Sequence, residues 1–174
     1  MNTYINNYHI KESRNSDNMD LNLREAEKSD IPKLADLWYE LASMHENMMD
    51  GYELSDEPKK AWIEFILSNY DKKSMITFMA EDEGSVVGFV TVVIRERPDI
   101  FKDKKVGMIL DLVVAEDRRN QGIGSALVDK SERWIKEKGV SVGVLTVAPE
   151  NNGAVNFWDD KGYKTYLLKK RKDL

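Results

Sequence analysis

Hydrophobic and polar positions along the chain repeat with two different periods, which predict strands and helices in alternation. Apolar residues that alternate with polar ones, or that form short unbroken runs, predict strands. Such strands are expected over residues 21–26, 75–80, 86–94, 106–114, 140–147 and 163–168. Apolar residues three and four positions apart predict helices with one buried face. Such helices are expected over residues 31–49, 58–70, 122–138 and 151–161.

Polar and glycine-containing sequences mark the ends of these elements. Asp30 is placed to cap the first helix, and Gly139 and Gly162 follow the last two helices, where glycine commonly ends a helix. Residues 81–84 join two strands as a hairpin. The resulting order, β-α-α-β-β-β-α-β-α-β, predicts an α/β sheet with antiparallel hairpins on one side and a βαβ unit on the other.

Length and composition favour a single globular domain. The 174 residues fit one domain, and 41% of them are hydrophobic, which supports a packed core. Residues 1–18 are rich in asparagine and lack either period, so we expect a flexible lead-in followed by one domain over residues 19–174. No apolar run approaches the roughly 20 residues that cross a bilayer, and the first residues do not resemble a secretory signal. A cytoplasmic protein without membrane contact is expected.

Charge and residue usage argue against several classes of function. The formal net charge of −5 disfavours a nucleic-acid binder that works by phosphate neutralisation. The chain has no cysteine, which excludes disulfides, thiolate metal sites and a cysteine nucleophile. Its two histidines, His9 and His45, are far apart in the sequence, and no metal site is predicted.

The clearest chemical signal is a glycine-containing loop between the strand at 106–114 and the helix at 122–138. The N–H groups that begin a helix lack intrahelical partners and carry the positive end of the helix dipole, so they bind phosphates well. Gly122 and Gly124 allow a ligand to approach the backbone, and Arg119 can add charge-assisted hydrogen bonds. A glycine needed only for the turn is the alternative. A P-loop is disfavoured because its Lys-Ser/Thr ending is missing.

Two sequence blocks resemble the GNAT family of N-acetyltransferases. Residues 112–124 contain Leu-Val-Val, four residues, Arg, two residues and Gly-x-Gly, which resembles that family's acyl-CoA signature. Residues 147–163 are similar to its Asn-x-x-Ala-x-x-Phe-Tyr-x-x-x-Gly-Phe run, and residues 27–31 to its first strand-to-helix junction. The resemblance covers about residues 20–168. It implies a mixed, mostly antiparallel sheet of about six to seven strands, flanked by about four helices and splayed at the acetyl-CoA site.

The resemblance implies acetyl-CoA as the acetyl donor and assigns residues to it. Strand backbone would pair with the pantetheine arm, and the N–H of Val113 or Val114 would polarise the thioester carbonyl. Asn151 would contact the donor's arm, cap the following helix, or do both. The donor-binding residues expected in this way are Leu112, Val113, Val114, Arg119, Asn120, Gln121, Gly122, Ile123, Gly124, Ser125, Ala126 and Asn151.

The chain departs from the family pattern at the residues expected to move protons. Leu110 stands where several relatives have a glutamate, and Trp158 where many have a tyrosine acid. We expect Asp111 to act as the catalytic base or to hold the base's water; a structural strand carboxylate is the alternative. Trp158 can donate a hydrogen bond to the sulfur or line the donor tunnel, but it cannot deliver a proton. Further candidates are Glu81 and His45 for the base, and water, Tyr163 and Tyr166 for the acid.

The acceptor is expected to be a primary amine held by the first two helices and their loop. His45, Glu46 and Tyr52 are the predicted substrate-binding residues, and acidic side chains there would attract a cation. A small-molecule amine, a polyamine and a peptide or protein amine stay open, and the resemblance is compatible with a homodimer. The amine would attack the thioester directly in a ternary complex. The alternative is a non-catalytic module that senses acyl-CoA. It is suggested by Leu110 and Trp158, the two positions that depart from the family pattern.

Overall fold

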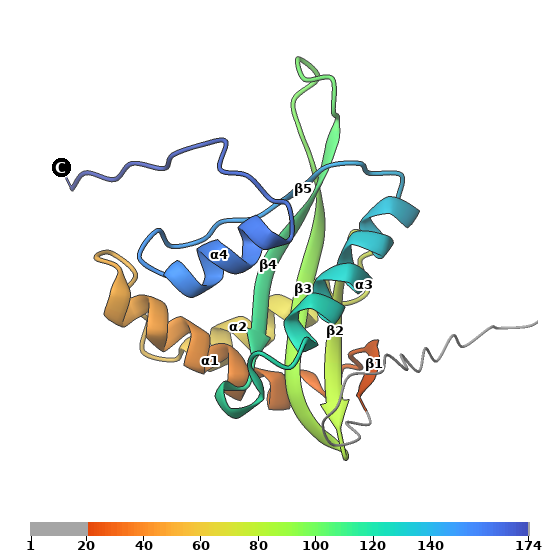
Figure 1. Ribbon diagram of the computed structural model, residues 1–174, viewed down its shortest axis with the longest axis vertical. Helices are drawn as coiled ribbons and strands as arrows, with labels where there is room; N and C mark the ends of the chain where they lie inside the picture. Colours follow the sequence, from red (N-terminus) through yellow and green to blue (C-terminus); the bar gives the residue numbers. More distant parts are fainter. Residues whose placement is uncertain (1–20, 174) are drawn as a thin grey trace, which may run out of the picture.

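The structure of the protein, a computed structural model, describes residues 21–173, and the lead-in expected at 1–18 lies outside these residues. The elements, shown in Figure 1, are β1 (Asn22–Glu25), α1 (Ile31–Met48), α2 (Pro58–Asn69), β2 (Met75–Asp82), β3 (Ser85–Glu96), β4 (Lys105–Val114), the 3-10 turn η1 (Glu116–Arg118), α3 (Ile123–Glu137), β5 (Gly143–Val144) and α4 (Asn152–Asp160). All four predicted helices are confirmed. In the described part of the chain, none of them is long and apolar enough to cross a membrane.

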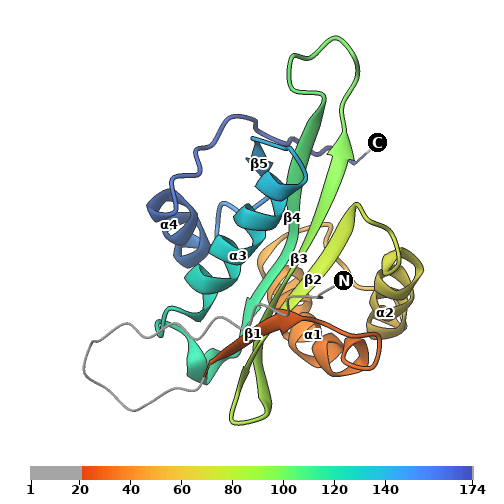
Figure 2. The ribbon, with the colours of Figure 1, turned by 90° about the vertical axis from the view of Figure 1, so that its right-hand side faces the viewer.

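The five strands form one sheet in sequence order. Strands β1 to β4 are antiparallel neighbours, and β5 lies parallel to β4. Helix α3 provides the crossover from β4 to β5, as a parallel pair requires. Figures 1 and 2 show that the ends of β3 and β4 extend beyond the body of the molecule as a long hairpin. The predicted combination of antiparallel hairpins and one βαβ unit is therefore confirmed.

Helices cover both faces of the sheet. Figure 2 shows α1 and α2 on one face and α3 and α4 on the other. The core on the first face consists mainly of Ile31, Leu34, Trp62, Ile66, Met79, Phe89 and Val113. The core on the second face includes Phe78, Val90, Val92, Ile109, Ile123, Leu127, Val128, Ile135 and Trp158. Burial of this apolar surface drives the two layers of helices onto the sheet.

Strand β4 carries a bulge in its middle. Asp111 is the partner of Thr91 and Ile109 the partner of Val92, so Leu110 has no partner of its own in β3. Leu110 packs in the cluster under α1 and α2, and Asp111 contacts α2 from the same face. Ile109 packs in the cluster on the other face. The extra residue thus turns two successive side chains toward the first two helices, and bulges of this kind re-aim side chains near functional sites.

The last two predicted strands differ from the structure. Strand β5 covers only Gly143–Val144, and residues 163–168 form no strand, so within residues 21–173 the sheet has five strands instead of about six to seven. Both segments contain residues that favour strands, but a strand also needs a neighbouring backbone to pair with. Tyr166, Leu167 and Leu168 are 68%, 73% and 78% exposed. The apolar pattern of residues 163–168 therefore predicted a buried strand, whereas these three side chains are exposed.

The predicted cap of α1 is also different. The Asp30 carboxylate makes no hydrogen bond to the first N–H groups of the helix; it accepts one from the Glu27 N–H at 2.8 Å and two from Arg24 at 2.6 and 3.0 Å. Arg24 also donates to Glu81 at 2.9 and 3.0 Å. The nearby guanidinium holds the pKa of Asp30 below its ordinary value. A charged network thus replaces the cap and joins β1, β2 and the start of α1.

Candidate active site

The predicted phosphate-binding loop lies between β4 and α3. The chain leaves β4 at Val114, makes the turn η1, and passes through Asn120 and Gly122 with φ angles of 61° and 83°. Asparagine tolerates this left-handed region better than most residues, and glycine adopts it without strain. Gly122 is the N-cap of α3, and it is exposed together with Gln121. The loop therefore presents the start of α3 at the surface.

The first N–H groups of α3 have no partner within the helix. The hydrogen bond that opens the helix runs from the Ala126 N–H to the Gly122 carbonyl at 3.0 Å. The N–H groups of Ile123, Gly124 and Ser125 precede this bond and have no carbonyl one turn earlier in the helix. Together with the positive end of the helix dipole they can bind an anion. The local geometry therefore fits a pyrophosphate.

Ionic and polar side chains hold this loop in place. Arg118 forms an ion pair with Asp82 at 2.8 Å, and Asp82 is only 5% exposed. Arg119 Nε donates to the Val114 carbonyl at 3.3 Å, and Gln121 Nε2 donates to the Asp117 carbonyl at 3.2 Å. The Arg118–Asp82 pair ties the loop to the β2–β3 hairpin. Sequence reasoning missed it because no local spacing connects two residues so far apart in the chain.

Helix α4 lies beside the same loop. The neighbours closest to a Cβ built on Gly124 are Phe157 of α4 at 3.6 Å and Val114 of β4 at 3.7 Å. Asn151 caps α4, because its Oδ1 atom accepts a hydrogen bond from the Ala154 N–H at 3.1 Å. The capping role expected for Asn151 is confirmed. A contact to the donor would use the Nδ2 N–H groups of the same side chain.

Strand β4 has an open edge next to the loop. Its pairing with β5 covers only Gly107 and Met108, and in the described part of the chain no strand pairs with this edge beyond them. The Ala115 N–H donates to β3, at the Val87 carbonyl 3.0 Å away. Because alternate residues of a strand face the same side, the Val113 N–H also faces β3, and the Val114 N–H faces the open edge. Of the two expected N–H donors, only that of Val114 can meet a ligand there.

Asp111 lies under α1 and α2 in a largely apolar environment. Trp62 Nε1 donates to its Oδ2 atom at 3.4 Å. Burial raises the pKa of Asp111 to about 6, and hydrogen bonding by Trp62 and Trp38 opposes this shift. A carboxylate with this pKa is ionised at neutral pH and still basic enough to accept a proton. Sequence reasoning missed the two tryptophans, although a buried indole N–H usually needs an acceptor.

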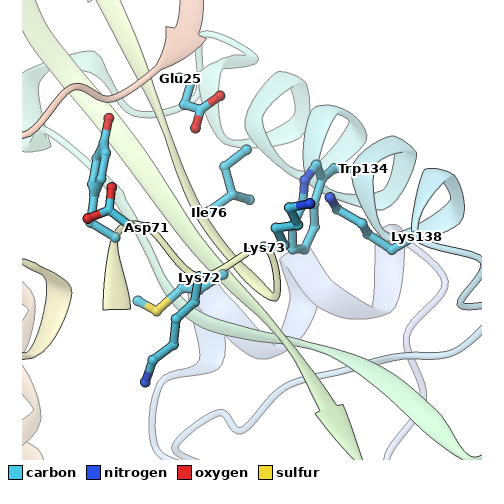
Figure 3. Close-up of a pocket in the computed structure, with 9 residues that line it drawn as sticks. Glu25, Asp71, Lys72, Lys73, Ile76, Trp134 and Lys138 are labelled. Carbon is cyan, nitrogen blue, oxygen red and sulfur yellow. The ribbon is translucent and has the colours of Figure 1, made fainter. Parts of the chain in front are cut away.

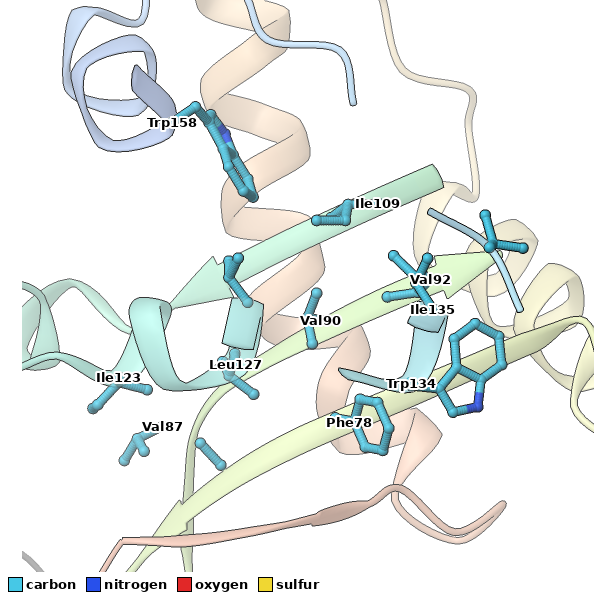
Figure 4. Close-up of a cluster of buried hydrophobic side chains, with 13 residues drawn as sticks. Phe78, Val87, Val90, Val92, Ile109, Ile123, Leu127, Trp134, Ile135 and Trp158 are labelled. Atoms are coloured by element: carbon cyan, nitrogen blue, oxygen red, sulfur yellow. The ribbon is translucent and has the colours of Figure 1, made fainter. Parts of the chain in front are cut away.

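Trp158 lies in the hydrophobic core. It is 8% exposed, and Figure 4 shows its ring directed toward the sheet near Ile109. Phe157 and Tyr163 make edge contacts with it at centroid distances of 5.1 and 5.2 Å. This position suits a side chain that packs against its neighbours better than one that donates a hydrogen bond to the sulfur of acetyl-CoA. Burial, with a further contribution from Glu132, raises the pKa of Tyr163, so its phenol holds its proton tightly.

The three predicted acceptor-binding residues come together at the end of α1. The rings of His45 and Tyr52 meet edge to face with their centroids 6.2 Å apart. Glu46 Oε1 accepts a hydrogen bond from the Leu54 N–H at 2.8 Å and so closes the α1–α2 turn. Burial lowers the pKa of His45, which favours its neutral imidazole. Glu81 is bound to Arg24 and has no contact that would support it as a base.

A separate polar cavity lies away from these residues. Figure 3 shows its lining, with Glu25 from β1, Lys72 and Lys73 from the turn before β2, and Trp134 and Lys138 from the end of α3. None of the predicted donor, acceptor or catalytic residues lines it. Its charges are of mixed sign. The candidate site is therefore the loop, the open edge of β4 and the face of β4 under α1 and α2.

Comparison with known proteins gives a family match over most of the chain. The model of the acetyltransferase (GNAT) family matches residues 36–163. An uncharacterised N-acetyltransferase of Methanocaldococcus jannaschii is 27% identical over 143 residues, which make up 82% of this chain and 60% of that protein. The match thus spans only part of this relative's length.

Solved structures show the same architecture. A putative acetyl transferase from Pyrococcus furiosus superposes with a TM-score of 0.68 and 27% identity, over 88% of this chain and 99% of the other. A predicted acetyltransferase from Clostridium acetobutylicum, solved with acetyl-CoA, has a TM-score of 0.71 at 15% identity, over 87% of this chain and 96% of the other. At that identity the second likeness shows the fold alone.

Proposed function

The chain belongs to the acetyltransferase (GNAT) family, and from this premise we propose that it transfers the acetyl group of acetyl-CoA to a primary amine. The observation that carries the proposal is the loop before α3, where Gly122 turns the chain and N–H groups without helical partners begin the helix. An anion site of this kind beside an open strand edge provides places for both the pyrophosphate and the peptide-like pantetheine arm of the donor.

Three parts of the chain would each contact acetyl-CoA. The N–H groups of Ile123, Gly124 and Ser125 would bind the pyrophosphate, with Arg119 adding charge. The open edge of β4 would pair with the pantetheine arm, and the Val114 N–H would donate to the thioester carbonyl. Arg119 already donates to the Val114 carbonyl, which links the pyrophosphate contact to this edge. Asn151 would add a hydrogen bond from α4.

Asp111 would receive the proton that the amine loses. The amine nitrogen attacks the thioester carbonyl, the new C–N bond forms, the C–S bond breaks, and water protonates the departing thiolate. A base whose pKa is near 6 is ionised at neutral pH, as proton acceptance requires. We assign no acid role to Trp158, because indole cannot supply a proton. Holding the two reactants together would supply a further part of the rate enhancement.

The acceptor would approach from the side of α1 and α2. His45 and Tyr52 form an aromatic corner there, and acidic residues around it favour a cationic amine. Asp50, Glu53 and Asp56 are exposed in the segment between the two helices. Which amine is used, the homodimer and the cytoplasmic location stay predictions.

A coupled assay tests the proposal. The protein is incubated with acetyl-CoA and a panel of small amines, polyamines and peptides, while free thiol and acetylated product are measured. Thiol release that matches acetylated product for at least one amine is expected. Calorimetric binding of acetyl-CoA without thiol release across the panel would support an acyl-CoA sensor instead. No binding of acetyl-CoA at all would contradict the assignment of the loop.

A further inference from the structure

We propose that Trp62 and Trp38 are positioning residues that hold the Asp111 carboxylate in its ionised form with neutral indole N–H donors. The proposal rests on the proposed function only for the proton that Asp111 receives; the indole–carboxylate contact itself is independent of it. Trp62 Nε1 lies 3.4 Å from Asp111 Oδ2, and hydrogen bonds from both indoles act on Asp111.

The two tryptophans form a rigid unit. Their rings stack with centroids 5.6 Å apart and planes inclined by 21°. Trp62 is 6% exposed and is also braced by Phe89, at a centroid distance of 5.6 Å. The rings come from different helices, α1 and α2, so the pair locks the direction of the indole N–H groups. Stacked aromatic rings of this kind have few alternative arrangements in a packed core.

The residues packed around Asp111 in the described part of the chain offer it neutral hydrogen-bond donors. Its partner in β3 is Thr91, and α1 and α2 present Trp38 and Trp62. Among the residues that the structure describes, no ion pair to Asp111 is found. Lys59 of α2 pairs with Asp36 of α1 at the surface. His45 is the next titratable residue on the same side of α1, seven positions or about 10 Å beyond Trp38 along the helix.

Neutral donors explain how one carboxylate can be both fixed and basic. A buried carboxylate needs hydrogen bonds, or its ionisation becomes very costly. A lysine or arginine would satisfy it but would also hold its pKa far below the range useful for accepting a proton. Indole N–H groups donate and cannot accept, so they favour the carboxylate over the carboxylic acid by less than a cation does. The bulge at Leu110 completes the arrangement by turning Asp111 toward them.

The first test uses the wild-type protein and NMR. The indole N–H signals are followed from pH 4 to pH 8, roughly the span around the pKa of Asp111. We expect the signals of Trp62 and Trp38 to move with one shared midpoint, and the signals of Trp134 and Trp158 to stay. His45→Gln removes the titration of the nearby imidazole and should leave the shared midpoint in place. Signals of Trp62 and Trp38 that do not titrate, or that lose their titration in His45→Gln, would overturn the proposal.

The second test separates the N–H group from the ring. Trp62→Phe keeps an aromatic ring in the stack but removes the indole N–H group. Trp38→Phe does the same at the less buried ring. We expect each variant to raise the midpoint of Asp111 and to move the acidic limb of the kcat/KM profile to higher pH by the same amount. A shift of one unit lowers kcat/KM about tenfold below the midpoint. Trp134→Phe, in the core on the other face, is the matched control and should shift neither.

The outcomes distinguish this inference from the proposed function. An unchanged or lowered midpoint in folded Trp62→Phe and Trp38→Phe would contradict the positioning role. If the indole signals titrate and both variants shift the midpoint, yet wild-type protein acetylates no amine, the positioning role stands and the proposed function fails.

Discussion

Asp111 is a residue whose ionisation the fold makes costly. Its pKa rises from 3.8 to about 6 through burial, so the folded state binds a proton between these values that the unfolded state has already lost. Stability therefore falls as pH rises from about 4 to about 6, and the cost is fully present above the folded pKa. A carboxylate kept at such a cost in a core-facing position is a candidate for function rather than for stability.

Asp111→Asn is expected to separate function from stability. The amide keeps an acceptor for the indole N–H groups but cannot take a proton, so acetyl transfer should fall strongly and the acidic limb of the pH–rate profile should disappear. The free energy of unfolding at pH 7 should rise by about 2–3 kcal/mol, at 1.36 kcal/mol per pKa unit. Thermal unfolding across pH 4–8 measures this effect. An unchanged pH–rate profile would remove Asp111 from the mechanism.

Gly124→Asp is expected to weaken acetyl-CoA binding without unfolding the protein. A Cβ at this position meets Phe157 and Val114 at ordinary contact distances of 3.6–3.7 Å, and an acidic residue in the first turn of α3 suits the helix dipole. The same charge would repel the pyrophosphate and should raise Kd by about 10- to 100-fold. Gly124→Ala is the matched control for the added Cβ. Calorimetry that finds equal Kd values for the two variants would contradict the placement of the phosphates.

At the scale of elements, the loop before α3 that we propose to bind the donor depends on contacts outside itself. The Asp82–Arg118 pair connects η1 to the β2–β3 hairpin, and Asn151 fixes the start of α4 beside Gly124. Neither contact lies within the Gly-x-Gly motif. The motif supplies the N–H groups, and the neighbouring elements decide where they are aimed.

Asp82→Asn should loosen the loop. Arg118 would lose its ionic partner while β2 and β3 stay paired. The loop would then be held less firmly, and KM for acetyl-CoA should rise about three- to tenfold, which corresponds to a loss of roughly 1 kcal/mol of binding free energy. The value of kcat at saturating acetyl-CoA should change little. Glu96→Gln is the control, because its 3.6 Å pair with Lys105 is exposed and lies on the far hairpin. Equal KM values in both variants would rule out a positioning role for Asp82.

Substitutions at Asn151 can separate its cap from its proposed contact to the donor. Asn151→Asp keeps an oxygen that caps α4 well but loses the Nδ2 donor, so melting temperature should be preserved while acetyl-CoA binding weakens. Asn151→Ala loses both and should also lower the free energy of unfolding by about 1 kcal/mol. Binding of acetyl-CoA to Asn151→Asp with wild-type affinity would limit Asn151 to the cap.

At the scale of the whole molecule, two carboxylates give opposite responses to pH. Arg24 holds the pKa of Asp30 below 3.8, so the stability this pair contributes is present above about pH 4 and is lost as pH falls through the lowered pKa. Burial raises the pKa of Asp111, so its cost is relieved as pH falls from about 6 to about 4. These two groups together favour a maximum of stability near pH 4, where the Asp30 contribution is present and the Asp111 cost has not yet grown.

Arg24→Met tests this balance. Asp30, whose side chain is 10% exposed, and Glu81 would both lose Arg24 as their ionic partner. The free energy of unfolding at pH 7 should therefore fall by about 2 kcal/mol. As pH falls below 4 toward the lowered pKa of Asp30, the difference from wild type should shrink, because protonation of Asp30 removes its ionic interaction with Arg24. Denaturant unfolding at pH 3, 5 and 7 measures it. A difference that stays constant over this range would show that Asp30 is not the group involved.

The sequence by itself determined the four helices, the first four strands and the family. The 3.6-residue period predicts all four helices because one apolar face of each must be buried, whatever it packs against. The turn before α3 could also be predicted, because Gly122 and Gly124 act through local backbone geometry at the start of this helix. The cap at Asn151, one of the two roles expected for this residue, could be predicted for the same reason. These features depend on residues within a few positions of one another.

Only the tertiary structure decided the pairings between distant residues. Residues 163–168 have a strand pattern but pair with no strand of the sheet, and Asp30 binds Arg24 instead of its own helix. The bulge at Leu110 turns Asp111 toward Trp38 and Trp62, which lie on two other elements. Such contacts depend on which surfaces meet when helices pack on the sheet, and no local period or spacing encodes them.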